Sequence, residues 1–455
     1  MSRSGFTALE TRAVVSLTSL YLVRMLGLFM ALPVLSLYAP DYAGSTPLLM
    51  GVAIGIYGLS QALLQLPLGM LSDRIGRKPI IFGGLALLAV GSVIAATSTS
   101  IFGLILGRCV QGAGAIGSTL MALVADLTQE RNRTKAMASV GVSIGVSFVI
   151  ALVLGPLITR WAGLDGMFMA TAGFALAGLA IARFAVPTPI ADQRAGNARA
   201  PSRALLGAVL RDPALVRLDI GVFALHFIVT ALFVSVPLVL QNELGIAREL
   251  HSAVYAGLLV ASFVAMVPLM IFAERHKQVR AVFIMTVTLM ACSLTALSLR
   301  YTGFYPALGA LFVFFIAFNY LEACLPSLVS RSCRSDNRGT ASGVYSSCQF
   351  LGAFLGGTAG GWMLQQHDMA GVFWLCTAVA VAWGAVAIGM NSPRYLRAIR
   401  LHFDDAISET MVASLRDLPG VREVLLTTGE REGVLQVDET VFDERSLAAL
   451  PVRCV

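Results

Sequence analysis

Charged residues are scarce in this sequence. Asp, Glu, Lys and Arg make up 13% of its 455 residues, whereas apolar residues make up 57%. A soluble domain carries about 25% charged residues. The deficit falls almost entirely between residues 14 and 390, so a soluble globular domain is excluded for this region.

Motifs for enzyme chemistry are also missing. The sequence has no nucleotide-binding P-loop, no H-E-x-x-H and no C-x-x-C. Its seven cysteines are scattered, and six lie in or beside apolar stretches, so neither a disulfide framework nor a zinc site is predicted. We therefore expect no metal, no cofactor and no ATP-driven chemistry within this chain.

Two apparent enzyme motifs lie inside apolar stretches. Residues 112–117 fit G-x-G-x-x-G, and residues 141–145 fit G-x-S-x-G. The first pattern binds a dinucleotide only after a strand, and the second needs a strand-to-helix elbow. Close helix packing by small residues explains the first better, and the protein is not expected to be an enzyme.

Long apolar runs fill the region in which charge is missing. A helix needs about 20 predominantly apolar residues to cross a bilayer. The runs do not alternate apolar and polar residues as barrel strands do. The sequence therefore predicts an all-α polytopic protein in a lipid bilayer. The twelve predicted spans are 14–38, 49–71, 79–98, 101–125, 137–159, 167–186, 217–240, 253–273, 279–299, 304–330, 338–362 and 369–390.

Lys and Arg are distributed unevenly between the loops. With the N-terminus inside, the outer loops hold only Arg160, Arg248 and Arg300. Cytoplasmic loops carry the excess of these residues, so both termini are predicted to be cytoplasmic in a multi-pass protein of the cytoplasmic (inner) membrane. The net charge of +7 is thus a topology signal, and no nucleic acid is expected as a partner. Residues 1–13 lead directly into a span, so no cleavable signal peptide is predicted.

The chain divides into two halves, a linker and a tail. Residues 1–186 and 217–393 each hold six predicted spans. Residues 187–216 form a cytoplasmic linker with a predicted interfacial helix at 203–211. Residues 394–455 have a soluble composition, with eight Lys and Arg against eleven Asp and Glu.

The two halves repeat each other at equivalent places. Residues 67–74 (P-L-G-M-L-S-D-R) align without gaps on residues 268–275 (P-L-M-I-F-A-E-R). Residues 132–136 (N-R-T-K-A) likewise align on residues 337–341 (N-R-G-T-A). Duplicated halves packed around a site at the bilayer midplane are the architecture of alternating-access transporters.

One inner loop carries a specific resemblance. Residues 69–79, G-M-L-S-D-R-I-G-R-K-P, resemble the signature loop of the major facilitator superfamily. The first span (L-G-L-F-M-A-L-P-V-L, 26–35), the fourth span (G-R-C-V-Q-G-A-G, 107–114) and Asp126 also match. In the fifth span, Gly145 and then Gly155-Pro156 are similar to the drug/proton antiporter motif, as helix-bending residues.

The resemblance departs from the antiporter motif at one point. That motif continues with more glycine, whereas residues 157–159 here are Leu, Ile and Thr. The resemblance covers the whole membrane region. Together with the small tail, the chain looks most like the YajR-type transporters.

The signature loop can act as a conformational latch. Asp73 ends the second span, where an anion facing a neighbouring helix N-terminus is stabilised by about 0.3–1 kcal/mol. The resemblance implies that this helix is the eleventh span, near Gly339, and that Arg77 bridges Asp73 and Asp126. Ordinary solvated charges obeying the positive-inside pattern are the alternative. The expected latch comprises Gly69, Asp73, Arg74, Gly76, Arg77, Lys78, Asp126 and Gly339.

Four ionisable residues lie well inside predicted spans. Arg24, Arg108, His226 and Glu322 each cost about 2.5–3.5 kcal/mol at the bilayer centre, so each needs a reason. At ~1.5 Å per residue, Arg24, His226 and Glu322 lie ~12–15 Å from the inner face, and Arg108 with Gln111 lies deeper. We expect these five residues to line a cavity and couple transport to protons. If their helices face one cavity, Arg24 and Glu322 can pair.

Each of these residues also has a structural interpretation. An ion pair alone would explain Arg24, and a hydrogen bond inside the bundle would explain a neutral His226. Helix–helix hydrogen bonds explain the other cavity candidates equally well. These candidates are Gln61, Gln65, Asn319 and Tyr320.

The tail predicts a small ferredoxin-like α+β domain. It reads as strand 395–403, helix 405–417, strands 421–427 and 432–438, helix 443–449 and a short last strand, which is a βαββαβ order. Leu418-Pro419-Gly420-Val421 resembles heavy-metal-associated domains. Those domains bind metal through C-x-x-C, which residues 402–405 (H-F-D-D) lack. A regulatory or self-association module is therefore predicted.

These observations predict a secondary active transporter that moves a small-molecule substrate by alternating access, coupled to protons and exporting. Proton-coupled uptake is the alternative within transport. A membrane sensor that binds a ligand and signals through the tail is the alternative outside it. Residues 274–277 (E-R-H-K), a weaker copy of the signature loop, leave room for the sensor.

Overall fold

The computed structural model of the chain describes residues 6–187, 203–299, 303–333, 338–391, 396–403, 409–426, 432–438, 442–443, 446–447 and 452–454. Ten helical stretches in this part are long and apolar enough to cross a membrane. Two of them are divided by non-helical residues, at Gly163 and at His367-Asp368, and each supplies two spans. The predicted twelve-span helical fold is confirmed.

The spans follow the chain without rearrangement. Their elements are α1 (Ala8–Phe29) continued by α2 (Leu32–Tyr38), α3 (Pro47–Ile75), α4 (Arg77–Thr97), α5 (Ile101–Ala113) continued by α6 (Gly117–Leu127), α7 (Glu130–Ala180) continued by η2 (Ile181–Ala185), α10 (Pro213–Leu238) continued by η3 (Val239–Glu243), α11 (His251–Arg275), α12 (Val279–Ser298), α13 (Phe304–Ser332) and α14 (Arg338–Ile388). Short elements η1 (Ala39–Asp41), α9 (Arg203–Arg211) and η4 (Arg248–Leu250) join them.

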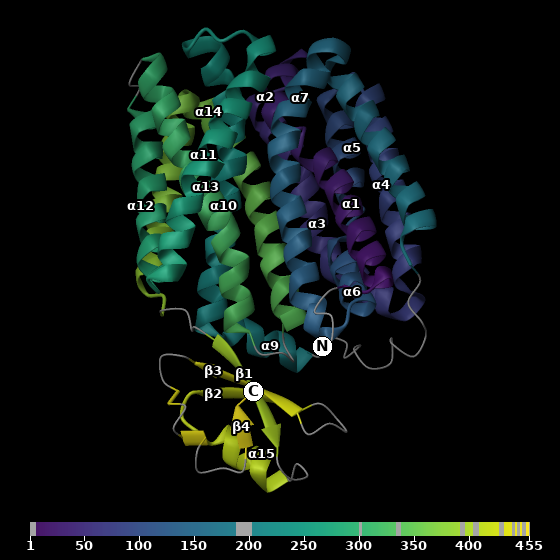
Figure 1. Cartoon of the computed structure of the whole chain (residues 1–455). Helices are drawn as coiled ribbons and strands as arrows, with labels where there is room; N and C mark the ends of the chain where they lie inside the picture. The colour runs from purple at the N-terminus through teal and green to yellow at the C-terminus, as the bar shows by residue number, and fades with distance from the viewer. Residues whose placement is uncertain are drawn as a thin grey trace.

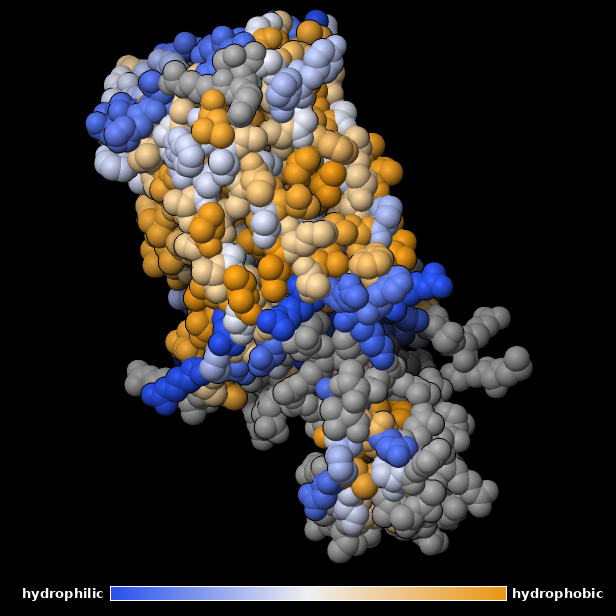
Figure 2. All heavy atoms as spheres, turned by 90° about the vertical axis from the view of Figure 1, so that its left-hand side faces the viewer, coloured by the Kyte–Doolittle hydropathy of each residue, from blue (hydrophilic) through white to orange (hydrophobic). Residues whose placement is uncertain are grey.

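The surface of the bundle suits a lipid environment. Hydrophobic residues gather over the middle of the face that Figure 2 shows, and hydrophilic residues gather at both ends. Large apolar side chains remain exposed on the helices of the bundle, such as Val264 at 63% and Ile271 at 59% in α11. In water such a surface would be unfavourable, whereas lipid tails solvate it.

Two halves stand side by side in Figure 1, the first in purple and blue and the second in teal and green. Close packing of α14 on α3 joins the halves, and α14 packs equally closely on α10 within the second half. Glycines let these backbones approach, because a Cβ at Gly352 would meet the carbonyl of Phe223 in α10 and one at Gly55 would meet the carbonyl of Phe354 in α14. The glycines of the eleventh span thus serve close packing.

The duplication visible in the sequence is repeated in the contacts. At the start of α4, Lys78 donates to the carbonyl of Val186, 2.9 Å away, after η2. At the start of α12, Arg280 donates to the carbonyl of Ile388, 2.8 Å away, at the end of α14. The third and sixth spans of each half are therefore joined in the same way.

The described part of the tail forms a four-stranded antiparallel sheet. It contains β1 (Leu396–Phe403), α15 (Glu409–Arg416), β2 (Val421–Leu426), β3 (Glu432–Asp438) and β4 (Val452–Cys454). The strand order is β2-β3-β1-β4. This order agrees with the predicted ferredoxin-like plan. Most of the predicted helix 443–449 lies outside the described residues, as do the first residues of the predicted helix 405–417.

The sheet lies at the same end of the bundle as α9 and the beginning of α1 (Figure 1). This end is the one predicted to be cytoplasmic, and it is called the inner end below. The predicted interfacial helix at 203–211 is α9 (Arg203–Arg211).

Candidate functional site

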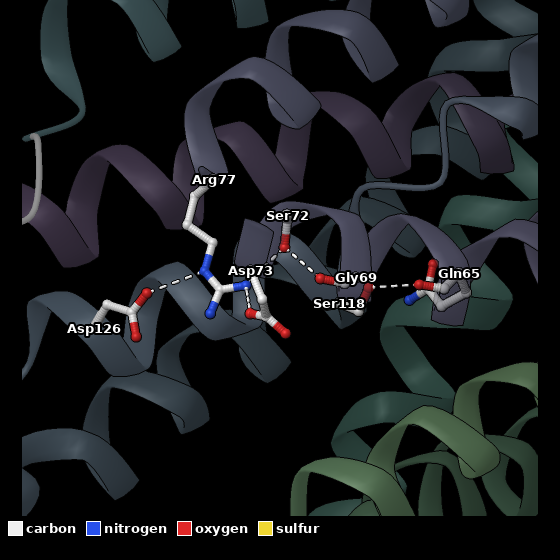
Figure 3. A network of polar contacts seen from close by, with 7 residues as sticks. All are labelled: Gln65, Gly69, Ser72, Asp73, Arg77, Ser118 and Asp126. Carbon is white, nitrogen blue, oxygen red and sulfur yellow. Dashed lines mark hydrogen bonds and ion pairs between the residues drawn. The ribbon is translucent and has the colours of Figure 1, made fainter. Parts of the chain in front are cut away.

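The signature loop holds a compact polar network at the inner end (Figure 3). Arg77 forms an ion pair with Asp73, and its Nε lies 3.1 Å from Oδ2 of Asp126. Its Nη1 donates to Oγ of Ser72 at 2.7 Å, and Ser72 donates to the carbonyl of Gly69 at 2.6 Å. One guanidinium therefore joins the ends of α3 and α6.

Backbone geometry places this network. Gly76 separates α3 from α4 with a φ of 99°, a backbone conformation that residues other than glycine rarely adopt. The turn brings Arg77 back over the last turn of α3, four residues after Asp73. Arg74 is exposed, and Lys78 points to the end of η2.

The expected contact of Asp73 with the eleventh span is absent from the described contacts. Gly339 lies exposed in the first turn of α14, and the described partner of Asp73 is Arg77. Deeper in the bundle the two helices do meet, because a Cβ at Gly343 would contact the side chain of Leu66. The link from Asp73 across the halves stays a prediction.

An ion pair that the sequence did not suggest occupies the equivalent place in the second half. Arg331, near the end of α13, donates to both carboxylate oxygens of Glu274 at 2.6 and 3.3 Å. The alignment of residues 67–74 on 268–275 places Glu274 at the position of Asp73, which was the available signal.

Two arginines are fully buried in the first half. Arg24 is 1% exposed and donates to Oε1 of Gln61 at 2.8 Å. Gln61 in turn donates to the hydroxyl of Tyr57 at 3.3 Å. The guanidinium of Arg108, which is 0% exposed, lies 5.1 Å from the centre of the Tyr57 ring. Contacts through Gln61 and Tyr57 thus connect the two guanidinium groups.

From Arg108, these polar contacts continue to α4, the third span. Arg108 donates to Oε1 of Gln111 at 2.9 Å, and Gln111 donates to Oγ of Ser92 at 2.7 Å. Arg24 Nε and Nη1 and Arg108 Nη2 have no hydrogen-bond partner among the described residues. The first half therefore buries positive charge that no described carboxylate neutralises through an ion pair.

A second polar group lies in the other half, between α10, α13 and α14. Nδ1 of His226 lies 3.1 Å from the carbonyl of Val222, so in the neutral ring Nδ1 carries the proton and donates it. Nε2 then accepts from the amide of Gln349, 2.7 Å away. Oε2 of Glu322 lies 3.6 Å from the same Nε2.

The two polar groups do not form the predicted Arg24–Glu322 pair in this structure. Arg24 bonds to Gln61 within its own half, and the described charge partner of Glu322 is His226. The similar depth expected for Arg24 and Glu322 carried no information on helix orientation. Asn319 donates to Ser262 of α11 at 3.1 Å, which is a helix–helix hydrogen bond.

Sequence reasoning missed three polar residues of α10 and α14. Gln349 bonds to its ring, and Asp219 and Tyr345 are buried at 7% and 8% exposure. Asp219 lies six residues after Pro213 at the beginning of α10, so its place near the predicted end of a span concealed its burial.

Several contacts join the halves at the middle and the outer end of the bundle. The rings of Phe148 in α7 and Phe318 in α13 have centroids 5.4 Å apart. Arg248 lies over the Tyr38 ring at 5.2 Å, and the amide of Leu48 donates to Gln365 at 3.3 Å. Phe318 lies one helical turn outward of Glu322 on the same helix.

The antiporter-motif residues lie along α7. Gly155 faces the carbonyl of Met30, between α1 and α2, and Pro156 lies inside the helix. Gly145 is exposed, and a Cβ there would meet nothing within 4 Å. Within the described ranges, no group of three or more His, Cys, Asp or Glu could hold a metal ion.

Comparisons with known proteins agree with this architecture. The pattern of the Major Facilitator Superfamily matches residues 17–357 and 218–405. The chain is 41% identical over 437 residues to the inner membrane transport protein YajR of Escherichia coli strain K12, covering 95% of both chains. It is 29% identical over 352 residues to the multidrug resistance protein MdtH of Yersinia pestis strain Pestoides F, covering 75% of this chain and 84% of that protein.

A solved structure shares the fold. The human organic anion transporter MFSD10 (TETRAN) superposes with a TM-score of 0.61 and 18% identity, over 84% of this chain and 100% of that one. The family pattern matches both six-span halves, and YajR is similar to this chain over nearly its whole length. The chain therefore belongs to the major facilitator superfamily of membrane transporters, a class without enzymatic activity.

Proposed function

We propose that this protein is a proton-coupled exporter of a small solute in the inner membrane, with both termini in the cytoplasm. Membership of the superfamily establishes transport as its class. Support for the direction comes from MdtH, a relative named for multidrug resistance. Support for the location comes from the Lys- and Arg-poor outer loops and from YajR, which is named as an inner membrane protein.

The Glu322–His226 pair carries the proposal of proton coupling. It combines a carboxylate with the one side chain whose usual titration range spans neutral pH. The Nε2 to Oε2 distance of 3.6 Å is slightly too long for a hydrogen bond while Nε2 accepts from Gln349. Oε2 of Glu322 has no hydrogen-bond partner in the described part of the chain. The pair is therefore arranged to take up one proton.

Uptake of that proton changes the partners within the pair. Because Nδ1 of His226 already donates to Val222, a proton on the ring goes to Nε2. Nε2 then becomes a donor, repels the amide hydrogens of Gln349 and attracts Glu322. A proton placed on Glu322 instead leaves a neutral carboxyl that tolerates apolar surroundings.

Such a change must differ between two conformations in order to drive transport. Glu322 lies one helical turn from Phe318, whose ring contacts Phe148 of the other half. Movement of α13 toward or away from His226 is therefore transmitted to a contact between the halves. The buried cations Arg24 and Arg108 provide the positive field that an ionised Glu322 meets when the halves approach.

The signature loop supplies the second element of the mechanism. We infer that Arg77 holds the ends of α3 and α6 together and presents Asp73 to the N-terminus of α14 when the inner end closes. The Asp73 carboxylate is exposed enough to exchange partners, because 26% of the side chain is accessible. Its interaction with a helix N-terminus is worth about 0.3–1 kcal/mol, which suits a reversible latch.

A transport assay tests the proposed function. Purified protein is reconstituted in proteoliposomes with an imposed pH gradient, and a panel of fluorescent cationic and anionic dyes is followed. We expect Glu322→Gln to abolish gradient-driven dye movement while dye binding persists. Glu243→Gln, at an exposed position on η3, is the matched control and retains transport. Gradient-driven transport by Glu322→Gln at the parental rate would remove Glu322 from the mechanism.

A further inference from the structure

Asp219 is a buried carboxyl without a described partner. Its side chain lies in α10 with 7% exposure. No hydrogen bond or ion pair joins it to another residue in the described ranges, in contrast to Asp73, Asp126 and Glu274. An isolated buried carboxylate is unfavourable in a membrane-embedded helix, and such residues are associated with ion and proton pathways.

The position of Asp219 points to the Glu322–His226 pair. Residues 219, 222 and 226 follow a helical spacing of three and four, so they share one face of α10. The carbonyl of Val222 accepts from His226 on that face. Seven residues of helix correspond to ~10 Å, which places Asp219 between the pair and the inner end.

The opposing face of α14 completes the arrangement. Gly352 packs on the carbonyl of Phe223, which fixes the two helices at that level. One and two turns nearer the inner end, α14 carries Cys348 and Tyr345, and both are within electrostatic range of Asp219. Tyr345 is also within electrostatic range of Glu322. Tyr345 lies one helical turn before Gln349, which bonds to His226, so it follows the pair toward the inner end on the same face of α14.

We propose that Asp219 is a second proton-binding residue, which relays protons through Tyr345 between the inner end and the Glu322–His226 pair. In one transfer, the tyrosine hydroxyl gives its proton to the Glu322 carboxylate and accepts the proton of the Asp219 carboxyl. Tyr345 is unchanged, Asp219 becomes a carboxylate and Glu322 becomes neutral. The proposal rests on the proton coupling proposed above and adds the route that the proton takes.

The surroundings contain few competing groups. From α14, Tyr345 and Cys348 are within electrostatic range of Asp219. From α13, Glu322 and Cys324 are within electrostatic range of Tyr345. The guanidinium of Arg217, on the same helix as Asp219, lies near Gly389 at the end of the bundle. A thiol is a weak hydrogen-bond donor and a weak acceptor, whereas a phenol hydroxyl does both well, so the tyrosine is the better relay.

Infrared difference spectroscopy after a pH jump tests the proposal without a known substrate. Protonated carboxyl groups absorb apart from the amide bands, so each titrating side chain gives its own signal in the purified full-length protein. We expect Asp219→Asn to remove one carboxyl signal and to slow protonation of Glu322 by roughly a hundredfold, the lower end of the usual contribution of a positioned proton-transfer group. Tyr345→Phe should keep both signals and slow Glu322 similarly.

Controls separate a relay from a structural role. Asp219→Glu should restore the rate, because it keeps the carboxyl, and Glu243→Gln should change nothing. If Glu322 protonates at the parental rate in Asp219→Asn, the relay is wrong and the proposed function stands. If Glu322→Gln removes no signal, the proposed proton site is wrong, and the relay to it is wrong as well.

Discussion

Arg331 binds both carboxylate oxygens of Glu274, at 2.6 and 3.3 Å, and so joins the inner ends of α13 and α11. In the first half, the equivalent helix ends are joined by Arg77, which contacts Asp126 and Asp73. The charges are arranged differently, because the fourth span carries the acid Asp126 near the end of α6, whereas the tenth span carries the base Arg331 near the end of α13. The second half therefore keeps the clamp although its sequence has lost the signature.

The Glu274–Arg331 pair predicts a small, charge-dependent stability effect. The two side chains are 45% and 29% exposed, and ion pairs of this kind contribute about 0.2–1 kcal/mol. We expect Glu274→Gln to lower the free energy of unfolding by less than about 1 kcal/mol. The double exchange Glu274→Arg with Arg331→Glu should recover most of this loss. Thermal unfolding at low and high salt measures both, and a salt-independent loss would contradict an ionic origin.

The signature loop is expected to control access to the inner end. Asp73→Asn removes the charge offered to α14, and Arg77→Ala releases α3 from α6. Both variants should raise the rate at which a membrane-permeant thiol reagent labels Cys348, provided that the other cysteines are replaced. Arg74→Gln, an exposed neighbour in the same loop, is the control. Equal labelling of parent and variants would contradict the latch.

Glycine packing between α10 and α14 is expected to be sensitive to one methyl group. A Cβ at Gly356 would meet the carbonyl of Phe227, which cannot move as a flexible side chain can. Gly356→Ala should destabilise the protein by about 1–3 kcal/mol, the usual cost of overpacking. Gly257→Ala, where a Cβ meets nothing within 4 Å, is the control. The midpoint of thermal unfolding of the two variants decides the comparison.

The tail is predicted to be a separate unit. The described part of residues 394–455 has its own small core, which includes Leu401, Leu415 and Leu435. Deletion of this segment should leave a monodisperse, membrane-inserted protein with altered regulation of transport. Size-exclusion chromatography and the dye assay measure these two properties. Aggregation of the shortened protein would mean that the tail stabilises the bundle.

Much of the fold follows from the sequence because lipid restricts backbone structure to satisfied helices. The lengths of the apolar runs were sufficient to define the spans. The distribution of Lys and Arg between the loops predicted which helix ends lie on the same side of the membrane. The break within α14 at His367-Asp368 also coincides with the predicted outer turn between 362 and 369. Within the tail, the predicted strands 395–403, 421–427 and 432–438 agree within one residue with β1, β2 and β3.

The site was less accessible to sequence reasoning because partners depend on helix rotation. Depth along a helix placed Arg24 and Glu322 at one level, but only packing shows that each bonds within its own half. Asp219 was overlooked because a charge near the end of a span can be solvated. Its burial follows from the close approach of α14, which no local pattern encodes.

Arg24 offers the sharpest distinction between a structural and a coupling role. Its hydrogen bond to Gln61 stabilises the first half, and two of its nitrogens remain without a described partner. If its charge acts on Glu322 when the halves approach, Arg24→Gln weakens the ionised form of that carboxylate. Proton release then requires a lower proton concentration, so the pH optimum of gradient-driven dye transport should move upward.

Gln61→Ala is the matched control for this experiment, because it removes the hydrogen bond and keeps the charge. It should lower thermal stability to a similar degree as Arg24→Gln and leave the pH optimum in place. Arg24→Lys, which preserves the charge without the planar donor geometry, should restore the optimum while the stability stays reduced. If Gln61→Ala and Arg24→Gln share one pH profile, Arg24 acts only as a hydrogen-bond partner inside the first half, and the field at Glu322 must come from Arg108.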